Sequence, residues 1–496
     1  MDAYPGVMRG VFLAYLLWLL GYVFYNLYIH ALSGYPGPFL RKVFSFPSVW
    51  EVFTGTSVRN IDALHKKYGS VVRVAPDALS FSSAQAWKDI YGFKQRRRQI
   101  PKDYKRFPPI DDVLPILFSS DTDHARMRKL ISHAFSESAL KEQIPLVVSH
   151  MREFIHQLRT RVNESKDLTI DINEWCNYLA FDIVTDLSFG EPLGALSRGA
   201  PDPYIDGFFK SCRLFPIIPL LYEYSFVRLL FNLSMKIQAV KGSQEMGYLA
   251  TKEKVERRMS QDRTEKKDFM TYILHYNDEK GMSIPEIIGS TTVFVNAGGE
   301  ATAACICATI YLLLKNPRAY ARVKTEVCSS FQSERSIETS SLKHLDYLNA
   351  VIEESLRIYP PTPGNFSRRT DVSTEIDGHV VPPGTSVGVH QYSASHSPQN
   401  FLWPEQFAPE RWLKHAPKEY ENDIREAAQP WGVGPRNCVG KSVAALEIRM
   451  ALALLLWSFD MELPEGSKGW AESQTYNIVW NRTPLYIRLI PTARYS

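Results

Sequence analysis

Apolar side chains recur every three or four residues in several long segments of the chain, a spacing that predicts α-helices. These segments are His124–Phe135, Glu142–Arg161, Ile172–Phe189, Pro285–Leu314, Asn316–Ser330 and Leu345–Tyr359. Short segments rich in β-branched residues predict strands, namely Val71–Val74, Ala78–Phe81 and Thr385–Val389. No fixed-period repeat or Gly/Ser linker appears after residue 45. The pattern therefore predicts one continuous body over residues 46–496, mainly α-helical with small β-sheets.

The N-terminal pattern is different, because the segment Gly10–Ile29 is apolar on every face and carries no charge. A helix of that length crosses a hydrocarbon core of about 30 Å. We therefore expect a short segment 1–9, a transmembrane anchor over 10–30 and a Pro/Gly hinge over 31–45. A cleaved signal peptide is the alternative, but its apolar region is usually only about 7–15 residues long.

The charges that flank this segment bear on where the body lies. Arg9 precedes the apolar run, and Arg41 and Lys42 follow it, so the positive-inside rule favours a cytoplasmic body only slightly. Glycosylation sequons at Asn163, Asn232, Asn365 and Asn481 would be occupied in a lumenal body.

The amino-acid composition and the net charge exclude several other classes of protein. Hydrophobic residues make up 45% of the chain and charged residues 22%, as in a globular protein with a large core. The net charge of +4 is too small for a body built to bind nucleic acid. Six cysteines in 496 residues show neither a disulfide framework nor zinc spacing, which indicates a reduced, intracellular protein.

The strongest chemical signal is the loop Trp431–Gly440, which leads into the apolar segment Lys441–Trp457. Its glycines permit tight turns and the close approach of a flat ligand. Cys438 stands at the start of the predicted helix, where unpaired amides and the helix dipole favour an anionic sulfur. Arg436 is suited to a carboxylate on a bound cofactor. Such a thiolate could bind haem iron or act as a nucleophile.

Other motifs precede this loop in a set order. Glu354 and Arg357 form an E-x-x-R pair on one helix face, and Pro409–Trp412 reads P-E-R-W. This order, followed by G-x-G-x-R-x-C-x-G, resembles the cytochrome P-450 superfamily of haem-thiolate monooxygenases over nearly the whole chain. The sequences of the segments HARMRKLISHAFS and FAPERW are similar to those of fungal, endoplasmic-reticulum members that act in secondary metabolism.

The resemblance implies a cytochrome P-450 fold and a role for each matching residue. Cys438 would be the proximal ligand of the iron of haem b. Glu354, Arg357 and Arg411 would form a buried network that supports the cysteine loop, and Trp431 stands where the family usually has Phe. The residues that match the family's contacts to the haem propionates are His124, Arg128, Arg368 and Arg436.

The distal helix departs from the family pattern. The chain reads Ala297-Gly298-Gly299-Glu300-Ala301-Thr302, and we expect the small residues at 297–299 to leave room for dioxygen. Glu300 matches the acid that helps to relay protons. Ala301 stands at the position of the usual threonine, and Thr302 lies about 100° further round the helix. Glu300 and Thr302 are therefore the candidate catalytic residues. Because Thr302 cannot simply replace the usual threonine, water or a substrate hydroxyl is expected to organise proton delivery instead.

The resemblance also implies partners and a reaction. One atom of O2 would be inserted into a lipophilic substrate, by hydroxylation or epoxidation, with electrons from NADPH through a separate NADPH–cytochrome reductase. Candidate docking charges are Lys441, Arg449 and Arg126. We expect a single-pass protein of the endoplasmic reticulum membrane with a cytoplasmic body. Substrate contacts are expected from the loops Ile100–Leu117, Leu214–Leu233 and Thr362–Phe366.

Three alternatives remain open from the sequence. The same fold could catalyse isomerisation, dehydration or radical coupling, because Ala301 replaces the usual threonine. The pattern Gly384-x-Ser386-x-Gly388 fits a serine hydrolase, although that motif needs a sharp strand-to-helix turn and no helix is expected directly after this strand. A haem sensor or membrane scaffold without catalytic activity is the third.

Overall fold

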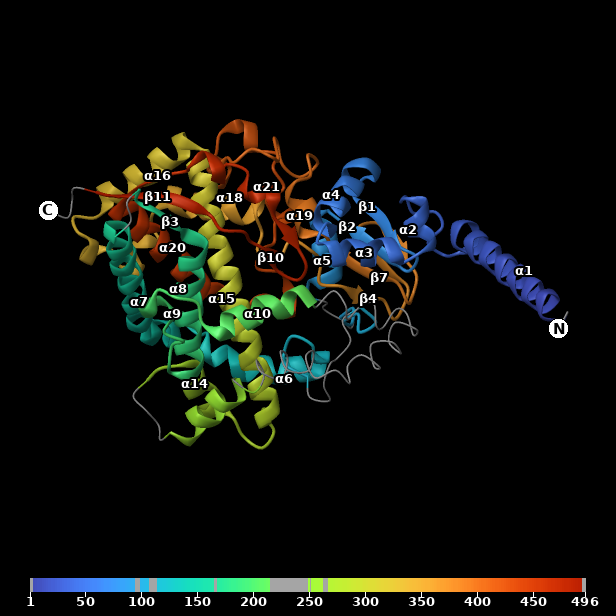
Figure 1. Ribbon diagram of the computed structural model, residues 1–496, viewed down its shortest axis with the longest axis horizontal. Coiled ribbons are helices and arrows are strands. Elements are labelled where there is room, and N and C mark those ends of the chain that lie inside the picture. Colours follow the sequence, from blue (N-terminus) through green and yellow to red (C-terminus); the bar gives the residue numbers. More distant parts are fainter. Residues whose placement is uncertain are drawn as a thin grey trace.

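The computed structural model of the chain describes residues 3–93, 99–106, 114–164, 167–214, 249, 251–261 and 266–492. Most of the predicted substrate loop Leu214–Leu233 and part of Ile100–Leu117 lie outside the described residues. Helices dominate one half of the molecule, a small sheet lies in the other half, and the N-terminal helix projects beyond the sheet (Figure 1). The predicted fold class, mainly α with small sheets, is confirmed.

The helical half is built around α15 (Ile284–Lys315), which packs along α8 (Ile172–Phe189) (Figure 1). The two helices approach closely because α15 carries two glycines at the contact. A Cβ atom added to Gly299 would lie 2.8 Å from the Phe181 ring, and one added to Gly298 would lie 2.8 Å from the Val184 side chain. These glycines therefore serve helix packing, and the expected room for dioxygen at positions 297–299 stays a prediction.

The sheet in the other half joins distant parts of the chain. Its strands β1 (Val71–Ala75), β2 (Ala78–Phe81), β7 (Ser386–Val389) and β4 (Arg368–Arg369) lie in that order. β2 pairs parallel to β7, from Ala78 opposite Ser386 to Phe81 opposite Val389. The helix α5 (Ala84–Tyr91) packs against β7. A second buried core forms here, around Leu79, Phe81, Trp87 and Val387.

The remaining elements complete these two halves. The other helices are α2 (Phe39–Val43), α3 (Phe46–Thr54), α4 (Ser57–Tyr68), α6 (Asp121–Ala134), α7 (Glu137–Glu164), α9 (Ala195–Arg198), α10 (Pro203–Leu214), α14 (Phe269–Tyr276), α16 (Pro317–Ser330), α17 (Thr339–Leu342), α18 (Asp346–Ile358), α19 (Gln391–Ser395), α20 (Lys441–Ser458) and α21 (Trp470–Ser473). The other strands are β3 (Thr169–Asp171), β5 (Thr374–Ile376), β6 (His379–Val381), β8 (Phe459–Glu462), β9 (Thr475–Tyr476), β10 (Trp480–Asn481) and β11 (Tyr486–Pro491). Short 3-10 turns lie at Glu334–Ser336, Pro409–Trp412, Lys418–Tyr420, Arg425–Ala427, Gly434–Arg436 and Glu465–Ser467.

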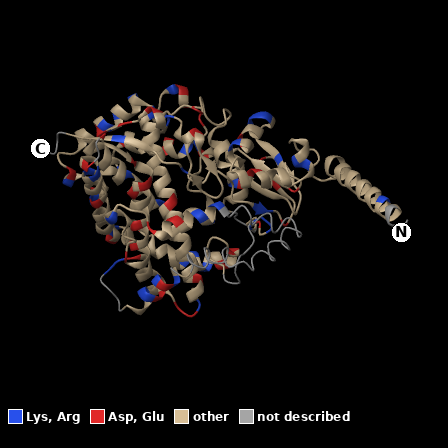
Figure 2. Cartoon of the chain, in the orientation of Figure 1, with Lys and Arg blue, Asp and Glu red and all other residues tan. Residues whose placement is uncertain are grey.

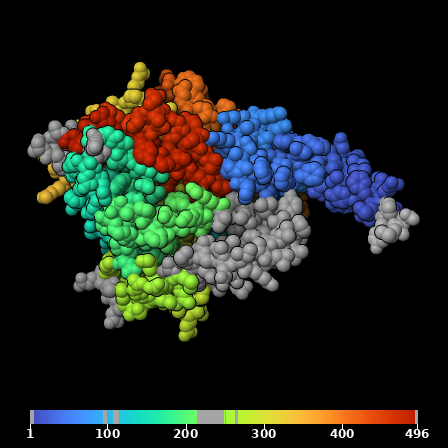
Figure 3. All heavy atoms as spheres, in the orientation of Figure 1, coloured from blue at the N-terminus to red at the C-terminus, as the bar shows by residue number. Residues whose placement is uncertain are grey.

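The N-terminal apolar segment forms α1 (Ala3–Phe24) and continues as a π-helical turn over Tyr25–Ile29. The segment Gly6–Ile29 is long and apolar enough to cross a membrane, with a mean hydropathy of 1.8. It stands clear of the body and is almost free of charged side chains (Figures 2 and 3). The helix α15 also passes this test, but 78% of its apolar window is buried, as in the core helix of a soluble body.

The end of this N-terminal segment is fixed to the sheet. The Arg73 side chain is fully buried on β1, where its Nη1 donates to the carbonyl of Asn26 (2.8 Å) and its Nη2 to that of Pro76 (2.8 Å). Within the following Pro/Gly segment Leu32 is fully buried, and the Tyr35 hydroxyl donates to the carbonyl of Val380 (3.1 Å). We call the contact between Arg73 and Asn26 the clasp, because it joins the apolar helix directly to the body.

Candidate active site

The cysteine loop is held in a tight conformation by its own backbone. The amide of Cys438 donates to the carbonyl of Trp431 (2.8 Å), which closes the loop just before α20 begins at Lys441. Gly434 has a φ of +75°, and a Cβ atom there would lie 1.9 Å from the carbonyl oxygen of Tyr91. Only glycine fits this position, because both the dihedral angle and the neighbouring backbone exclude a side chain. Trp431 is half-buried against the main core.

The surroundings of Cys438 disfavour the free thiolate. The side chain reaches solvent, but the protein around it desolvates the thiol and raises its pKa. The amides of Gly440 and Lys441 and the charge of Arg128 oppose that shift without overcoming it. The start of the helix therefore stabilises the thiolate, as expected, but not enough to bring the pKa of Cys438 below its ordinary value. A bound metal ion deprotonates a coordinating thiol outright.

Four of the residues predicted to contact the haem line a single cavity of about 470 Å³ beside this loop. They come from distant segments of the chain, namely His124 and Arg128 on α6, Arg368 on β4 and Arg436 in the cysteine loop. The sequence-based grouping of these residues is therefore reproduced in space.

Two of these arginines are already engaged by the protein. Arg128 donates from Nη1 to the carbonyl of Asn437 (2.8 Å) and from Nη2 to its side-chain Oδ1 (2.9 Å), which ties α6 to the cysteine loop. Arg436 donates from Nη2 to Asp121 (2.7 Å) and to the carbonyl of Ser119 (2.9 Å). Its buried Nη1 finds no hydrogen-bond partner among the described residues.

Arg368 lines the same cavity from strand β4 of the sheet. It is 7% exposed, and its guanidinium lies over the Tyr91 ring, 5.5 Å from the centroid. Burial and the charge of Arg436 lower its pKa. A buried cation placed next to another cation indicates a site that is completed by an anionic ligand.

Lys102 belongs to the same group of cations, although the sequence patterns did not single it out. Its backbone bridges to Arg368, its ammonium donates to the carbonyl of Leu117, and it lies over the Phe118 ring. Burial, with Arg368 and Arg436 nearby, lowers the pKa of Lys102 to about 6. The sequence signal available was weak, because Lys102 stands in a run of basic residues that otherwise reads as a solvated surface.

His124 stays uncharged in these surroundings. Burial and then the charges of Arg436, Arg128 and Lys102 lower its pKa to about 3. A neutral imidazole keeps one N–H donor for a ligand oxygen.

The charge balance of the cavity tests whether a haem would fit. Among its lining residues Asp121 is the acidic side chain, against Arg128, Lys129, Arg368 and Arg436. This surplus of positive charge and the unpartnered Nη1 of Arg436 suit an anionic group with two carboxylates. Because Cys438 lies on the same loop as Arg436, the residues present fit a haem, whose iron Cys438 would bind and whose propionates the cationic residues would hold.

The support network predicted from the E-x-x-R and P-E-R-W motifs is assembled and fully buried. The Glu354 carboxylate accepts from Arg357 Nε and Nη2 (2.8 Å each) and from Arg411 Nε (3.2 Å). It also accepts from the Ala408 amide (2.9 Å) and from Trp412 Nε1 (2.8 Å).

The two arginines of this network extend it along the chain that precedes the cysteine loop. Arg357 donates to the carbonyls of Ser395, Pro404 and Gln406, and Arg411 to Asp423 and the carbonyl of Leu402. The network therefore fixes the segment 395–423, and any support of the cysteine loop passes through that segment.

The candidate proton residues on α15 lie on a different face from the alanines. Ala297 is exposed and Ala301 half-exposed, one turn apart on one face of the helix. Glu300 and Thr302 are each only 3% exposed, so both point into the protein. Burial raises the pKa of Glu300 to about 7, against the opposing charge of Arg482. Glu300 can therefore gain or lose a proton near neutral pH. Neither Glu300 nor Thr302 faces the side that Ala301 faces, because each lies about 100° from it around the helix.

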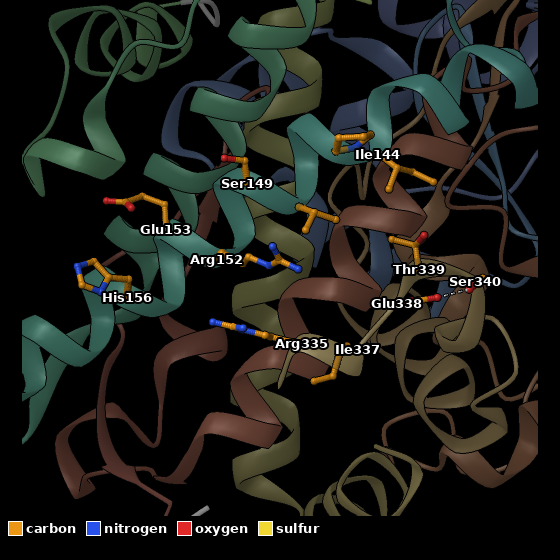
Figure 4. A pocket seen from close by; sticks show the side chains of 12 residues that line it. Ile144, Ser149, Arg152, Glu153, His156, Arg335, Ile337, Glu338, Thr339 and Ser340 are labelled. Atoms are coloured by element: carbon orange, nitrogen blue, oxygen red, sulfur yellow. Dashed lines mark hydrogen bonds between the residues drawn. The ribbon is translucent and has the colours of Figure 1, made fainter. Parts of the chain in front are cut away.

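Two other regions were candidates for chemistry. A cavity of about 720 Å³ lies between α7 and the segment 335–340, lined by side chains such as Arg152, His156 and Arg335, and it contains no predicted site residue (Figure 4). Ser386 is 3% exposed at the first position of β7. The short helix α19 does follow this strand, contrary to expectation, but Ser386 lies at the wrong end of β7 for a nucleophile elbow.

The comparisons with known proteins agree with this arrangement. A family model described as cytochrome P450 matches residues 35–489. Cytochrome P450 monooxygenase astJ from Aspergillus oryzae is 38% identical over 482 residues, which cover 96% of this chain and 95% of that protein. Averantin hydroxylase from Dothistroma septosporum is 37% identical over 484 residues, covering 96% of this chain and 90% of that one. The resemblance seen in the motifs is thus confirmed, and the chain belongs to the cytochrome P450 family of haem-containing monooxygenases.

Proposed function

We propose that this protein is a membrane-anchored monooxygenase that inserts one atom of O2 into a lipophilic small molecule in fungal secondary metabolism. The observation that carries the proposal is that Cys438 lies on the same tight loop that contributes Arg436 to the cationic cavity. Fungal relatives of nearly the same length, named as cytochrome P450 monooxygenases, support the reaction class. Epoxidation and hydroxylation are both open to such a site.

In this proposal the chain holds haem b with a small set of residues. Cys438 binds the iron, and the propionates lie against His124, Arg128, Arg368 and Arg436. The bound haem would supply the activation of O2, with a thiolate ligand that favours cleavage of the O–O bond. The protein's own part is to position the substrate, to exclude water and to hold a proton at Glu300.

Lys102 joins this set as a further contact of a propionate. Burial, and after it the nearby charges of Arg368 and Arg436, lowers the pKa of Lys102, and Asp121 opposes that shift. An anion in the cavity would restore its charge and add a charge-assisted hydrogen bond.

Electron supply and location follow from the same proposal. A separate NADPH–cytochrome reductase would deliver electrons to the face that carries the cysteine loop. Lys441 is exposed at the start of α20 and remains available for docking, whereas Arg126 is held by Glu286 (2.6 Å) and Asp123 (3.1 Å) and Arg449 by Asn349 (2.6 Å). The apolar helix Gly6–Ile29 would anchor the protein in the endoplasmic reticulum, with the body in the cytoplasm. Occupied sequons in the mature protein would contradict that orientation.

Two measurements test the proposal. The reduced, carbon-monoxide-bound difference spectrum of the wild-type chain should be of the thiolate type, and Cys438→Ser should abolish that signature. Products formed under isotopically labelled O2 should carry one labelled oxygen atom. Unlabelled product would favour the second candidate, a haem reaction without oxygen insertion, which the alanine at position 301 makes a specific alternative.

A further inference from the structure

The cavity of about 720 Å³ between α7 and the segment 335–340 shares no residue with the cavity beside the cysteine loop. One of its walls is a single face of α7, on which Ser149, Arg152 and His156 lie one turn apart. The other wall is the segment 335–340, which leads into α17. Small-molecule sites usually have volumes of about 300–1,000 Å³, so this cavity is large enough for a small ligand.

Each wall contributes an arginine to this cavity. The side chains of Arg152 and Arg335 extend into the space between α7 and the segment that faces it (Figure 4). Among the described residues neither guanidinium group has a hydrogen-bond or ion-pair partner. The other arginines of α7, Arg159 and Arg161, both pair with glutamates. Two cations therefore face one cavity without a counter-ion from the described part of the chain.

The carboxylates that line the cavity do not supply this counter-ion. Glu153 points away from Arg152 (Figure 4), and its Oε1 accepts from the Gln157 side chain (2.8 Å). The Glu338 carboxylate accepts from the Ser340 hydroxyl (3.4 Å). Neither carboxylate forms an ion pair with a described residue. The counter-ion that the two arginines lack would therefore come from solution.

We propose that this cavity binds a small, soluble organic molecule that carries a phosphate group, and that the phosphate lies between Arg152 and Arg335. A phosphate monoester carries a charge of about −1.5 to −2 at neutral pH and has three acceptor oxygens. Guanidinium groups bind such oxygens through paired, charge-assisted hydrogen bonds. The hydroxyl groups of Ser149 and Thr339, which line the same cavity, are further donors for a phosphate oxygen.

The apolar part of the lining indicates an organic body beside the phosphate. Ile144, Val148 and Ile337 line the cavity together with the polar groups. A ring or a carbon chain that packs against these side chains gains hydrophobic free energy, which inorganic phosphate cannot gain. An organic phosphate should therefore bind more tightly than inorganic phosphate.

The position of the cavity favours a soluble ligand over a lipid headgroup. The helix α7 lies near one end of the long axis of the molecule, and α1 projects from the other end (Figure 1). In the membrane-anchored protein proposed above, the cavity is therefore remote from the bilayer that contains α1.

Binding at this cavity should also be visible as a gain in stability. Both α7 and α17 pack against α20, the helix that begins just after Cys438. A ligand that bridges the two walls binds the folded protein only, because unfolding separates Arg152 from Arg335. Such a ligand raises the thermal midpoint.

The test uses the full-length, haem-loaded protein, in which haem is expected to occupy the cationic cavity beside the cysteine loop. Phenyl phosphate and inorganic phosphate are the probes, and their Kd values are measured by titration calorimetry. We expect the Kd for phenyl phosphate to rise about tenfold in Arg152→Met and in Arg335→Met, the equivalent of one charge-assisted hydrogen bond in each variant. Arg161→Met is the matched control, because Arg161 is exposed on the same helix and does not line the cavity. This control should keep the wild-type Kd.

Two further measurements separate this site from other ways of binding phosphate. Phenyl phosphate should raise the thermal midpoint of the wild type and of Arg161→Met, and should raise it less in Arg152→Met and Arg335→Met. Vesicles that contain phosphatidic acid should displace no more phenyl phosphate from the wild type than vesicles of neutral lipid. Displacement by phosphatidic acid alone would identify a lipid headgroup as the ligand and would contradict a soluble one.

Two other results would overturn the inference. One is an equal Kd for phenyl phosphate in Arg152→Met, Arg335→Met and Arg161→Met, since the ligand would then bind elsewhere. The other is a wild-type protein that binds neither probe. Arg152 and Arg335 are both exposed, so neither substitution changes the core, and one folded variant is sufficient for the comparison. None of these measurements requires turnover, so they do not depend on which reaction the haem site catalyses.

Discussion

Glu354 is the residue at which a single atom change should have the largest structural effect. Its carboxylate accepts five hydrogen bonds, three of them from the guanidinium groups of Arg357 and Arg411. All three side chains are fully buried. The change Glu354→Gln keeps the size of the side chain, replaces one acceptor oxygen by an NH2 group and removes the negative charge.

The expected cost follows from the charges that remain. Among the described residues Arg357 has no other carboxylate partner, and all of its remaining bonds go to backbone carbonyls, whereas Arg411 retains Asp423. Leaving a buried charge without its counter-ion costs about 3–5 kcal/mol. Because the total stability of a folded domain is about 5–15 kcal/mol, this change should remove a large share of it.

The measurement compares Glu354→Gln with Glu353→Gln in the full-length protein. Glu353 is the neighbouring residue on α18, half-exposed and outside the network, so its substitution tests for a general effect of charge loss on this helix. We expect a clearly lower thermal midpoint and a lower yield of haem-loaded protein for Glu354→Gln only. Equal midpoints for the two variants would refute the role of the buried network.

Three further predictions follow from the site and from the clasp. Gly434→Ala should reduce haem loading severely, because its Cβ would lie 1.9 Å from the Tyr91 carbonyl oxygen; the haem-to-protein absorbance ratio checks this, and normal loading would contradict it. Lys102→Met should release haem to an acceptor protein about tenfold faster, the equivalent of one charge-assisted hydrogen bond, whereas Lys105→Met, which removes an exposed partner of Asp77, should not. Deleting residues 1–30 should lower stability by about 1.5–3 kcal/mol relative to deleting residues 1–24, because only the longer deletion removes the Asn26 carbonyl from buried Arg73; equal thermal midpoints would exclude a structural role for the clasp.

The sequence predicted the helical body well because the long helices carry a continuous apolar stripe. The boundaries of α8 were predicted without error, and those of α15, α16 and α18 within one residue. The starts of α6 and α7 came earlier than predicted. The helix α6 begins earlier because the Ser120 hydroxyl caps it by accepting a hydrogen bond from the Asp123 amide (3.2 Å). The first turn of α6 is polar, so the apolar spacing from which the helix was predicted does not extend to it.

The site was predicted where short motifs fix both residue type and spacing, and missed where position depends on tertiary contacts. Cys438, Arg436 and the Glu354 network are read directly from such motifs. Lys102 could not be separated from its basic neighbours, because the residues that bring it into the cation group, Arg368 on β4 and Arg436 in the cysteine loop, are distant in sequence. The role of Gly298 and Gly299 in packing against α8 is likewise invisible without knowing which helix lies opposite.

The buried hydrogen bond between Arg73 and Asn26 would limit how the body moves relative to a helix that is held in a bilayer. This hydrogen bond joins the N-terminal helix rigidly to the body, so a tilt of the helix is transmitted to the body. In the membrane-anchored enzyme proposed above, the substrate entrance and the face offered to an electron donor would then keep a constant height and angle above the lipid. A donor embedded in the same membrane would search for that face in two dimensions rather than three.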